Sequence, residues 1–432
     1  MKKMLSTTKT LSLGLGLLFF LLAQVVFAQT SFTEFTGKVV DKNSGKPLEA
    51  VSLRLVNRNI GTVTNTEGDY VLKVPQDYMN AQLSVNLLGY KPYVIDLEDL
   101  KRTEAIIELN QLVTKLSQVN ISAYKSAKAL IEKIFKNRMK NFDDQYLKMT
   151  AFYRETIKRR NRNVSLTEAV VDIVKQPYDM LGRDKIGLSK ARKSTDYKRL
   201  DTLSVKLQGG PFSTIYLDVM KYTEYIFDEN YSNYRFTFDQ PSTIDNRDVY
   251  VVKFEPISNT MNLMYEGKLF IDVESLALVS AEYALDLRNK RRTKNLLVRK
   301  KPSDVIVYPV EANYKVDYSF DGEKWHYGYS NLYLKFKVNK KRSLFNKVYS
   351  LASEMAVTDW YKMKSRKDFD VKEPLRPSII IADEISGFSD PDFWGQYNLI
   401  EPEKSIESAI EKIQKSIERE KAKENNKEET LP

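Results

Sequence analysis

The chain contains no cysteine and only one histidine, His326, among its 432 residues. The absence of cysteine excludes disulfides, thiolate metal sites and a cysteine nucleophile. A single imidazole is too few for a zinc peptidase, because catalytic zinc generally takes three protein ligands and an all-carboxylate set would be unusual. By strand alternation, His326 should point away from Trp325 and Tyr327 toward a polar face, as a surface or strand hydrogen-bonding group.

Motifs of other catalytic classes are also missing. Walker-type phosphate loops, H-E-x-x-H and the EF-hand pattern do not occur, and the loop 389–395 lacks the full calcium spacing. The segment 328–332 comes nearest to a G-x-S-x-G serine elbow but lacks the second glycine. Glu155 and Glu168 are candidate glycosidase carboxylates, but with so many acidic residues chance pairs are expected. We therefore expect a non-enzymatic protein without metal or cofactor, with a secreted hydrolase that uses carboxylates as the alternative.

Residues 1–28 have the pattern of an export signal. Two lysines precede the apolar run LSLGLGLLFFLLAQVVFA, which ends in the small-x-small pattern Val26-Phe27-Ala28. Cleavage there would leave Gln29 as the new N-terminus, although a run of about 18 apolar residues is also near the minimum for an anchor helix. A lipoprotein would need a cysteine after the cleavage site. We therefore expect an exported protein of the periplasm or the outer membrane that is not a lipoprotein.

Composition and charge narrow the class further. With 42% hydrophobic and 29% charged residues, the chain suits two or more globular domains. The net charge is +11, or +8 without the three lysines of the leader, and basic clusters recur at 158–162, 288–294, 299–301 and 337–342. Such clusters usually form a solvated rim, and if they gather on one side they predict contact with an anionic membrane surface. Nucleic acid is disfavoured by the exported location.

Short β-like runs separated by turn residues occupy residues 31–110. In GTVTNTEGDYVLKV (61–74), the stretch Asn65-Thr66-Glu67-Gly68 predicts a turn whose glycine can take a positive φ. Tyr70, Leu72 and Val74 then share one face by period two, and the intervening residues 69, 71 and 73 share the other. This spacing predicts an antiparallel β-sandwich.

The same segment resembles the carboxypeptidase regulatory-like domain. The residues that carry the resemblance are Gly37, Val39, Asp41, Gly45, Pro47, Leu48, Val51, Gly61, Thr62, Gly68, Asp69, Tyr70, Leu72, Val74, Pro75, Leu88, Gly89 and Tyr90. The resemblance implies a seven-stranded transthyretin-like sandwich, which we place at 29–122. Residues 116–122 also resemble the segment that follows this domain in many Bacteroidetes envelope proteins. The family is a module and implies no activity.

The remaining chain predicts a helix, a β-rich body and a second helix. Residues 123–143 place their apolar side chains on one stripe, which indicates a connecting amphipathic helix. Alternation then continues through a β-rich body at 144–370. A loop and C-terminal amphipathic helix follow at 371–425, with a polar tail at 426–432. The predicted fold class is mainly β with flanking helices, in which the sandwich precedes a larger curved antiparallel sheet capped by helices.

Two features of the body are candidates for a binding site. In the hairpin EANYKVDYSFDGEKWHYGYS, a turn at Asp321-Gly322 would place Phe320 opposite Trp325, Tyr318 opposite Tyr327 and Val316 opposite Tyr329. Aromatic residues on a sheet face are usually core, but they also predict the lining of an apolar groove by Tyr314, Tyr318, Phe320, Trp325 and Tyr327. Gly209, Gly210 and Pro211 predict a tight turn, with a loop at the groove mouth as the functional alternative.

The body also resembles a group of uncharacterised exported Bacteroidetes proteins, through segments such as AFYRETIKRRNRNVSLTEAVVDIV. More loosely, its layout is similar to the periplasmic lipoprotein-carrier folds, which hold acyl chains in a curved sheet capped by helices. The predicted function is a docking or binding module of the envelope that holds an apolar or lipid ligand or a partner protein. An outer-membrane β-barrel is a further alternative, against which the chain ends in a charged amphipathic helix.

Overall fold

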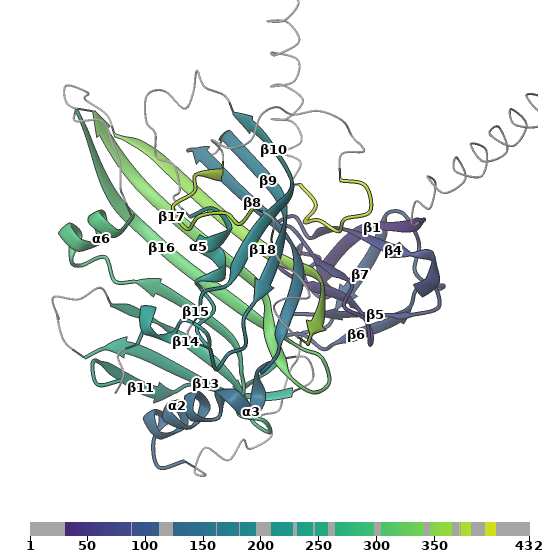
Figure 1. The fold of residues 1–432 in the computed structure, drawn as a ribbon, viewed down its shortest axis with the longest axis horizontal. Coiled ribbons are helices and arrows are strands. Elements are labelled where there is room, and N and C mark those ends of the chain that lie inside the picture. Colours follow the sequence, from purple (N-terminus) through teal and green to yellow (C-terminus); the bar gives the residue numbers. More distant parts are fainter. Residues whose placement is uncertain are drawn as a thin grey trace, which may run out of the picture.

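The computed structural model describes residues 31–402, except 88, 112–123, 161, 181, 196–208, 228–230, 245–246, 258–263, 298–303, 341–345, 365–370, 372 and 382–393. The predicted leader and the helix predicted after Pro402 therefore lie outside the described residues. None of the helices in these described ranges is both long enough and apolar enough to cross a membrane. Two β-rich units make up the described chain (Figure 1).

The first unit is a sandwich of two small sheets. One sheet has the order β4-β1-β7 and contains β1 (Phe32–Asp41), β4 (Asp69–Pro75) and β7 (Ala105–Leu109). The other has the order β3-β2-β5-β6 and contains β2 (Ser52–Leu55), β3 (Gly61–Val63), β5 (Gln82–Asn86) and β6 (Tyr93–Asp96). A short 3-10 helix, η2 (Gln76–Tyr78), follows β4. Phe35, Leu53, Leu72 and Val85 are fully buried between the sheets, which confirms the predicted seven-stranded sandwich.

The predicted turn of GTVTNTEGDYVLKV is also present. The Asn65 side-chain oxygen accepts hydrogen bonds from the backbone N–H of Glu67 and of Asp69, both at 2.9 Å, and Gly68 has a φ of +77°. The turn is therefore closed by the asparagine side chain, and the glycine takes the left-handed conformation that other residues resist.

The second unit is a sheet of eleven antiparallel strands. The main path runs β10-β9-β8-β18-β17-β16-β15-β14-β13-β11, and β12 pairs with β13 at the side. The strands are β8 (Tyr146–Arg159), β9 (Arg162–Lys175), β10 (Lys185–Thr195), β11 (Tyr234–Phe238), β12 (Ser242–Ile244), β13 (Arg247–Pro256), β14 (Tyr265–Asp272), β15 (Leu278–Leu285), β16 (Val305–Phe320), β17 (Trp325–Lys340) and β18 (Lys347–Met363). The sheet is open, and its edge strands in the described chain are β10 and β11 (Figure 1).

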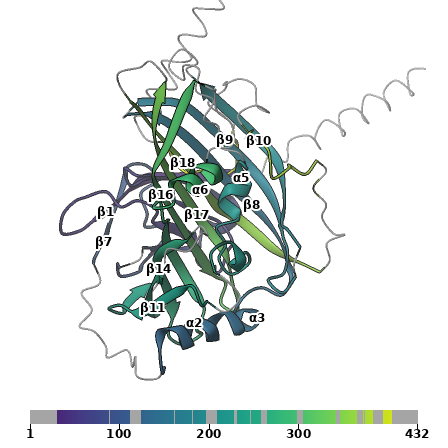
Figure 2. The same cartoon turned by 90° about the vertical axis from the view of Figure 1, so that its left-hand side faces the viewer.

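Helices cover one face of this sheet, which we call the helix-covered face. Ser126 caps α2 (Ala127–Lys136) by accepting from the Ala129 N–H, and α2 packs against β11 and continues into α3 (Arg138–Asn141). On the same face α5 (Pro211–Ile215) packs against β17 and β18 (Figure 2). The 3-10 helix η4 (Thr223–Tyr225) follows α5 in the chain. A further helix, α6 (Lys290–Leu297), lies beside β16.

The sandwich packs against the opposite face, which we call the sandwich-facing face. Residues 394–402, here named the strap, join the two units. The strap residue Asn398 bonds both backbone groups of Lys73, accepting from its N–H at 2.7 Å and donating to its C=O at 3.1 Å. Thr62 donates to the Leu399 carbonyl at 2.7 Å, and Arg154 of β8 donates to the Glu401 carbonyl at 3.2 Å.

The strap also changes the second face of β4. Asp69, Val71 and Lys73 share this face, and Val71 is 7% exposed and Lys73 is 8% exposed. Val71 makes an isolated bridge with Leu399 of the strap. Both faces of β4 are therefore covered, because a segment more than 300 positions later in the sequence lies over it.

Candidate functional site

A cavity of about 790 Å³ lies between the sandwich and the sandwich-facing face of the large sheet. The sandwich contributes residues of β2 and β5, such as Arg54 and Ser84, and the large sheet contributes Arg247, Lys315 and His326 among others. Neither unit forms this site alone. Its volume falls within the roughly 300–1,000 Å³ range of small-molecule sites, which occur preferentially at domain interfaces.

Aromatic rings form part of the cavity wall. Phe320 and Trp325 lie at the end of the β16–β17 hairpin with their ring centroids 5.1 Å apart, and Trp360 of β18 lies nearby in the lining. The Arg247 guanidinium lies over the Phe320 ring at 4.5 Å from its centroid. A guanidinium stacked on an aromatic ring keeps the N–H groups at its edge free to donate to an acceptor in the plane of the guanidinium.

His326 is buried in this wall, so the expectation of a surface histidine is wrong. Its side chain is 1% exposed, and its ring lies 4.2 Å from that of Trp360. Neither ring nitrogen has a hydrogen-bond partner among the described residues. Burial, and next the nearby charge of Arg54, lowers the pKa of His326 to about 3, so the imidazole is neutral near pH 7.

Ion pairs account for most of the carboxylates around the cavity. Lys315 lies 3.4 Å from Asp317, and Lys362 lies 2.9 Å from Asp321. Lys362 also reaches Asp143 at 3.5 Å, and burial raises the pKa of Asp143 to about 6. These pairs hold the two lysines against their own aspartates.

Three residue types of a serine triad meet here, but they do not make its contacts. Ser319 is opposite His326 in the strand register, yet its hydroxyl oxygen accepts from Arg54 Nη2 at 3.4 Å, and the His326 Nδ1–Asp143 Oδ2 distance is 3.9 Å. A nucleophile and its base lie about 2.6–3.2 Å apart. An imidazole whose pKa is lowered to about 3 is also a weak general base.

The sandwich, which covers the cavity opposite the large sheet, matches a known protein family. Residues 35–121 match the family model of the CarboxypepD_reg-like domain. The sandwich is a carboxypeptidase regulatory-like domain. The cavity therefore lies between this regulatory-like domain and the eleven-stranded sheet.

Two solved structures are similar to part of this chain at low sequence identity. A LolA superfamily protein from Nitrosomonas europaea is 12% identical, with 57% of this chain and 97% of that chain covered, at a TM-score of 0.20. A DUF1329 family protein from Desulfovibrio piger is 10% identical, with 57% and 96% covered, at a TM-score of 0.24. No curated protein matches the chain. At these TM-scores the two likenesses say nothing of what this chain does.

The five residues predicted to line an apolar groove fall into two groups. Tyr318, Phe320 and Trp325 border the cavity beneath the regulatory-like domain. Tyr327 is fully buried and is hydrogen-bonded to Ser330 at 2.5 Å, whereas Tyr314 is half-buried and stacks on Tyr283 with centroids 5.2 Å apart. The prediction of an apolar groove thus stays a prediction.

A bulge separates the observed hairpin register from the predicted one. Phe320 pairs with Trp325 and Tyr318 pairs with Tyr327, as predicted. The register then shifts, so that Asp317 rather than Val316 lies opposite Tyr329. The predicted Val316–Tyr329 pair is wrong, because the extra residue turns Tyr329 to the sandwich-facing face, where it packs with the strap residue Trp394.

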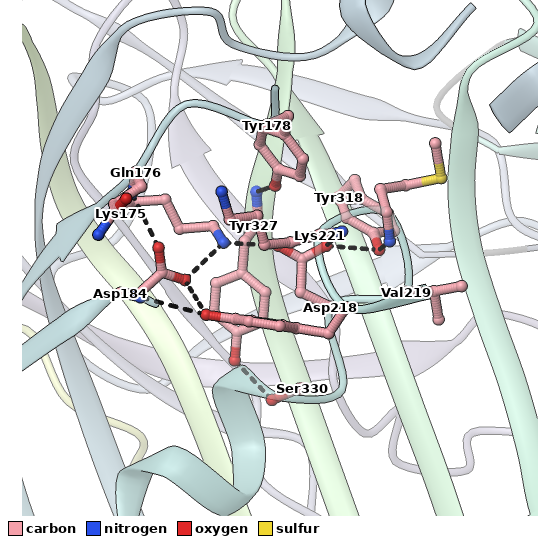
Figure 3. A network of polar contacts seen from close by, with 12 residues as sticks. Lys175, Gln176, Tyr178, Asp184, Asp218, Val219, Lys221, Tyr318, Tyr327 and Ser330 are labelled. Atoms are coloured by element: carbon pink, nitrogen blue, oxygen red, sulfur yellow. Dashed lines mark hydrogen bonds and ion pairs between the residues drawn. The ribbon is translucent and has the colours of Figure 1, made fainter. Parts of the chain in front are cut away.

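A buried network fills the helix-covered face behind the hairpin (Figure 3). Lys175 lies 2.8 Å from Asp184 and 2.7 Å from Asp218, and all three side chains are 1% exposed or less. Tyr222 donates to Asp184 at 2.9 Å, and Tyr318 donates to Asp218 at 2.9 Å. The network ties the chain after α5 to β9 and to β16, which is a structural role.

Gly209, Gly210 and Pro211 lead into α5 within the same face. Gly209 has a φ of +116° and Gly210 a φ of +47°, and all three residues are buried. The Gly209 N–H donates to the Ile379 carbonyl at 2.8 Å, and a Cβ on Gly210 would come within 3.3 Å of Ile381. The turn therefore packs against residues 379–381, and its assignment to a groove mouth stays a prediction.

Glu155 and Glu168 cannot act together on one substrate. Glu168 shares the sandwich-facing face with Arg154, its partner at 2.7 Å. Glu155 lies on the helix-covered face, where it accepts from Tyr153 at 3.0 Å, and burial raises its pKa to about 7. No group of three or more His, Asp or Glu side chains suited to a metal ion occurs in the part of the chain that the structure describes.

Two of the basic clusters lie at the same end of the large sheet. Lys337 pairs with Val348, and the next residue of β18, Tyr349, pairs with Arg159. The cluster at 288–294 extends into α6, whereas 299–301 lies outside the described residues. Contact of these clusters with an anionic membrane stays a prediction.

Proposed function

We propose that this protein is an exported, non-enzymatic binding protein whose ligand occupies the cavity between the regulatory-like domain and the large sheet. One observation carries the proposal. His326 is buried in the wall of an approximately 790 Å³ cavity, and neither of its ring nitrogens has a partner among the described residues. Buried polar groups are normally hydrogen-bonded, and leaving one unsatisfied costs about 1–3 kcal/mol. A ligand in the cavity can supply the missing bond when it displaces the side chains that cover the imidazole nitrogens.

The construction of the cavity supports binding rather than pure scaffolding. The strap binds the regulatory-like domain by the Asn398–Lys73 and Thr62–Leu399 hydrogen bonds and the large sheet by the Arg154–Glu401 hydrogen bond, so it fastens the two domains at one side of their interface. A second contact, in which Asn59 donates to the Trp360 carbonyl at 2.6 Å, lies in the cavity lining itself. The domains are thus held at fixed points, with an open volume between them.

The same geometry argues against catalysis. Ser319, His326 and Asp143 do not make the hydrogen bonds of a triad, and the imidazole is a weak base. The leader pattern of residues 1–28 supports the export to the envelope that we propose.

Intrinsic fluorescence tests the proposal directly. The chain has three tryptophans, of which Trp325 and Trp360 line the cavity and Trp394 lies in the strap. We expect a saturable fluorescence change when a ligand is found in a panel of dipeptides, sugars, sugar acids and fatty acids. The change should persist in Trp394→Phe and shrink in Trp360→Phe.

The lack of cysteine provides the control. A single thiol at Ser84→Cys, in the cavity wall, can be capped with a bulky maleimide, whereas Thr103→Cys places the same group on an exposed turn of the regulatory-like domain. Capping at position 84 should abolish binding, and capping at position 103 should not. Fatty-acid binding that survives the cap at 84 would contradict this site and favour an apolar groove elsewhere.

Turnover of a chromogenic ester or glycoside that Ser319→Ala or Glu155→Gln removes would contradict the non-enzymatic assignment.

A further inference from the structure

We infer that the ligand of this cavity is a small organic oxyanion, a ring or apolar body that carries one carboxylate or phosphate group. The inference rests on the proposed function and names the chemical class of ligand. It is carried by the charged side chains of the lining, the N–H donors beside them and the aromatic surfaces between them.

The cavity lining has more cations than anions. Asp317 and Asp321 are its carboxylates, and each lies within 4 Å of a lining lysine. The lining also contains three arginines, Arg54, Arg58 and Arg247, so it holds five basic side chains against two carboxylates. Arg247 is itself ion-paired at 3.7 Å with Asp272, a buried carboxylate that does not line the cavity. A cationic ligand would have to displace a lysine from its aspartate, whereas an anion meets a surplus of positive charge.

Two of the arginines come from different domains. Arg54 lies in β2 of the regulatory-like domain, and Arg247 begins β13 of the large sheet. Stacking on Phe320 fixes the plane of the Arg247 guanidinium, with a ring-centroid distance of 4.5 Å. Planar guanidinium groups match carboxylate and phosphate oxygens better than ammonium groups do. An oxyanion in the cavity is therefore within the reach of both domains.

Neutral N–H donors add to this preference. His326 is 1% exposed and Trp325 is 2% exposed, and both border the cavity. The indole Nε1 and both imidazole nitrogens have no hydrogen-bond partner among the described residues. An indole N–H can only donate, so it needs an acceptor such as an oxyanion oxygen. Because burial keeps His326 neutral near pH 7, it offers an N–H donor there without a second charge.

The aromatic walls define the rest of the ligand. Phe320, Trp325 and Trp360 border the same volume, and their faces suit a flat or ring-shaped body rather than a free inorganic ion. Aromatic surface together with a few convergent polar groups is the usual composition of a small-molecule site.

Two matched probe sets test the class of ligand. One consists of glucose, glucuronate and glucose 6-phosphate, and the other of phenylacetamide, phenylacetate and phenyl phosphate. Binding is followed by calorimetry and by the tryptophan fluorescence of the Trp394→Phe protein. We expect the acid or phosphate of a set to bind at least about tenfold more tightly than the neutral member, with an affinity that falls as salt rises. A preference for carboxylate over phosphate, or the reverse, identifies the group that the site takes.

Variants at the arginines connect this preference to the cavity. Arg54→Met keeps most of the side-chain stem and should weaken binding of the anionic probe about tenfold to a hundredfold, the loss expected for a hydrogen bond to a charged group. Arg247→Lys keeps the charge but loses the stacked fork, so it should weaken binding as well. Arg235→Met, at an exposed arginine of β11 that does not line the cavity, is the matched control and should bind as the unmodified protein does.

Two results would overturn the inference and leave the binding proposal intact. One is equal affinity for the neutral and anionic members of both sets, including no binding of either. The other is an equal loss for neutral and anionic probes in Arg54→Met, which would indicate a structural role of this arginine. The maleimide block at Ser84→Cys tests whether the ligand binds in the cavity, independently of its charge. A failure of the binding proposal can therefore be distinguished from a failure of the oxyanion inference.

Discussion

Glu155 should make the stability of the large sheet fall as the pH rises. Its carboxyl group is buried on the helix-covered face, and its hydrogen bond comes from the Tyr153 hydroxyl at 3.0 Å. Burial disfavours the charged form and raises the pKa of Glu155 from 4.5 to about 7. The folded protein therefore keeps this proton over a pH range in which the unfolded chain has lost it.

The sign and size of the effect follow from linkage. Between pH 4.5 and about 7 the unfolded state binds fewer protons at Glu155 than the folded state, so the free energy of unfolding decreases as pH rises. At about 1.4 kcal/mol for each pKa unit, the loss amounts to roughly 3 kcal/mol and is complete above the folded pKa. Glu155→Gln cannot ionise and should lack this loss.

Urea unfolding at pH 4.5, 6 and 8 measures the difference. Tryptophan fluorescence follows the large sheet and the strap, because all three tryptophans lie after the regulatory-like domain. Relative to the unmodified protein, Glu155→Gln should gain roughly 3 kcal/mol between the lowest and highest pH. Glu266→Gln, at an exposed position of β14, should show no such trend. Titration of His326 and Asp143 is common to all the proteins and cancels in the difference.

Parallel pH curves for Glu155→Gln and the unmodified protein would refute this reasoning. They would mean that Glu155 is ionised in the folded state. A charged Glu155 would need a cation or solvent beside it, and the hydrolase alternative would then regain a carboxylate able to act on a substrate.

Two further predictions concern the chain around α5. Lys175→Met leaves Asp184 and Asp218 buried without their shared cation and should lower the free energy of unfolding by about 3–5 kcal/mol. A loss below about 1 kcal/mol in the same urea assay would contradict a stabilising role of this network. Gly210→Ala places a side chain on a residue with a φ of +47° and within 3.3 Å of Ile381, and it should lower the free energy of unfolding by about 1–3 kcal/mol. An unchanged urea midpoint would show that this turn is not conformationally constrained.

The regulatory-like domain could be predicted because its signals are local. Asn65 and Gly68 fix a turn within four residues, and Tyr70, Leu72 and Val74 lie together in the core of the sandwich, as the period-two pattern requires. Turn chemistry and period-two patterning act over a few residues, which is the range that a single sequence displays. The family resemblance then extended this local pattern to the whole sandwich.

The hairpin of β16 and β17 shows where local reasoning ends. Its turn and its first aromatic pairs follow from the sequence, but the bulge at Gly328, opposite the step from Asp317 to Tyr318, does not. A Cβ on Gly328 would lie 2.4 Å from the Ser319 hydroxyl oxygen, so the glycine leaves room for the Ser319 side chain. A glycine inside a strand pattern is a known signal of a bulge, and it was available at this position.

The burial of His326 required knowledge that the strand pattern does not contain. Alternation correctly separates it from the face of Tyr327, and a polar face was then equated with solvent. The structure places the regulatory-like domain over that face. Docking of two domains depends on their whole surfaces and on the strap, whose contacts join residues such as Lys73 and Asn398 across most of the chain. The buried ion pair of Lys175 with Asp218 was missed for the same reason, since its partners are distant in sequence.

The two faces of the large sheet therefore differ in what they can hold. The helix-covered face is filled by α5 and by the network of Lys175, whereas the opposite face retains a cavity because a second domain lies over it and is fastened by the strap. A ligand that touches Arg54 and Arg247 at once would bind only the docked arrangement of the domains and would stabilise it by mass action. Under the proposed function, ligand binding and domain docking would be coupled equilibria, and a variant that loosens the strap should weaken ligand binding without contacting the ligand.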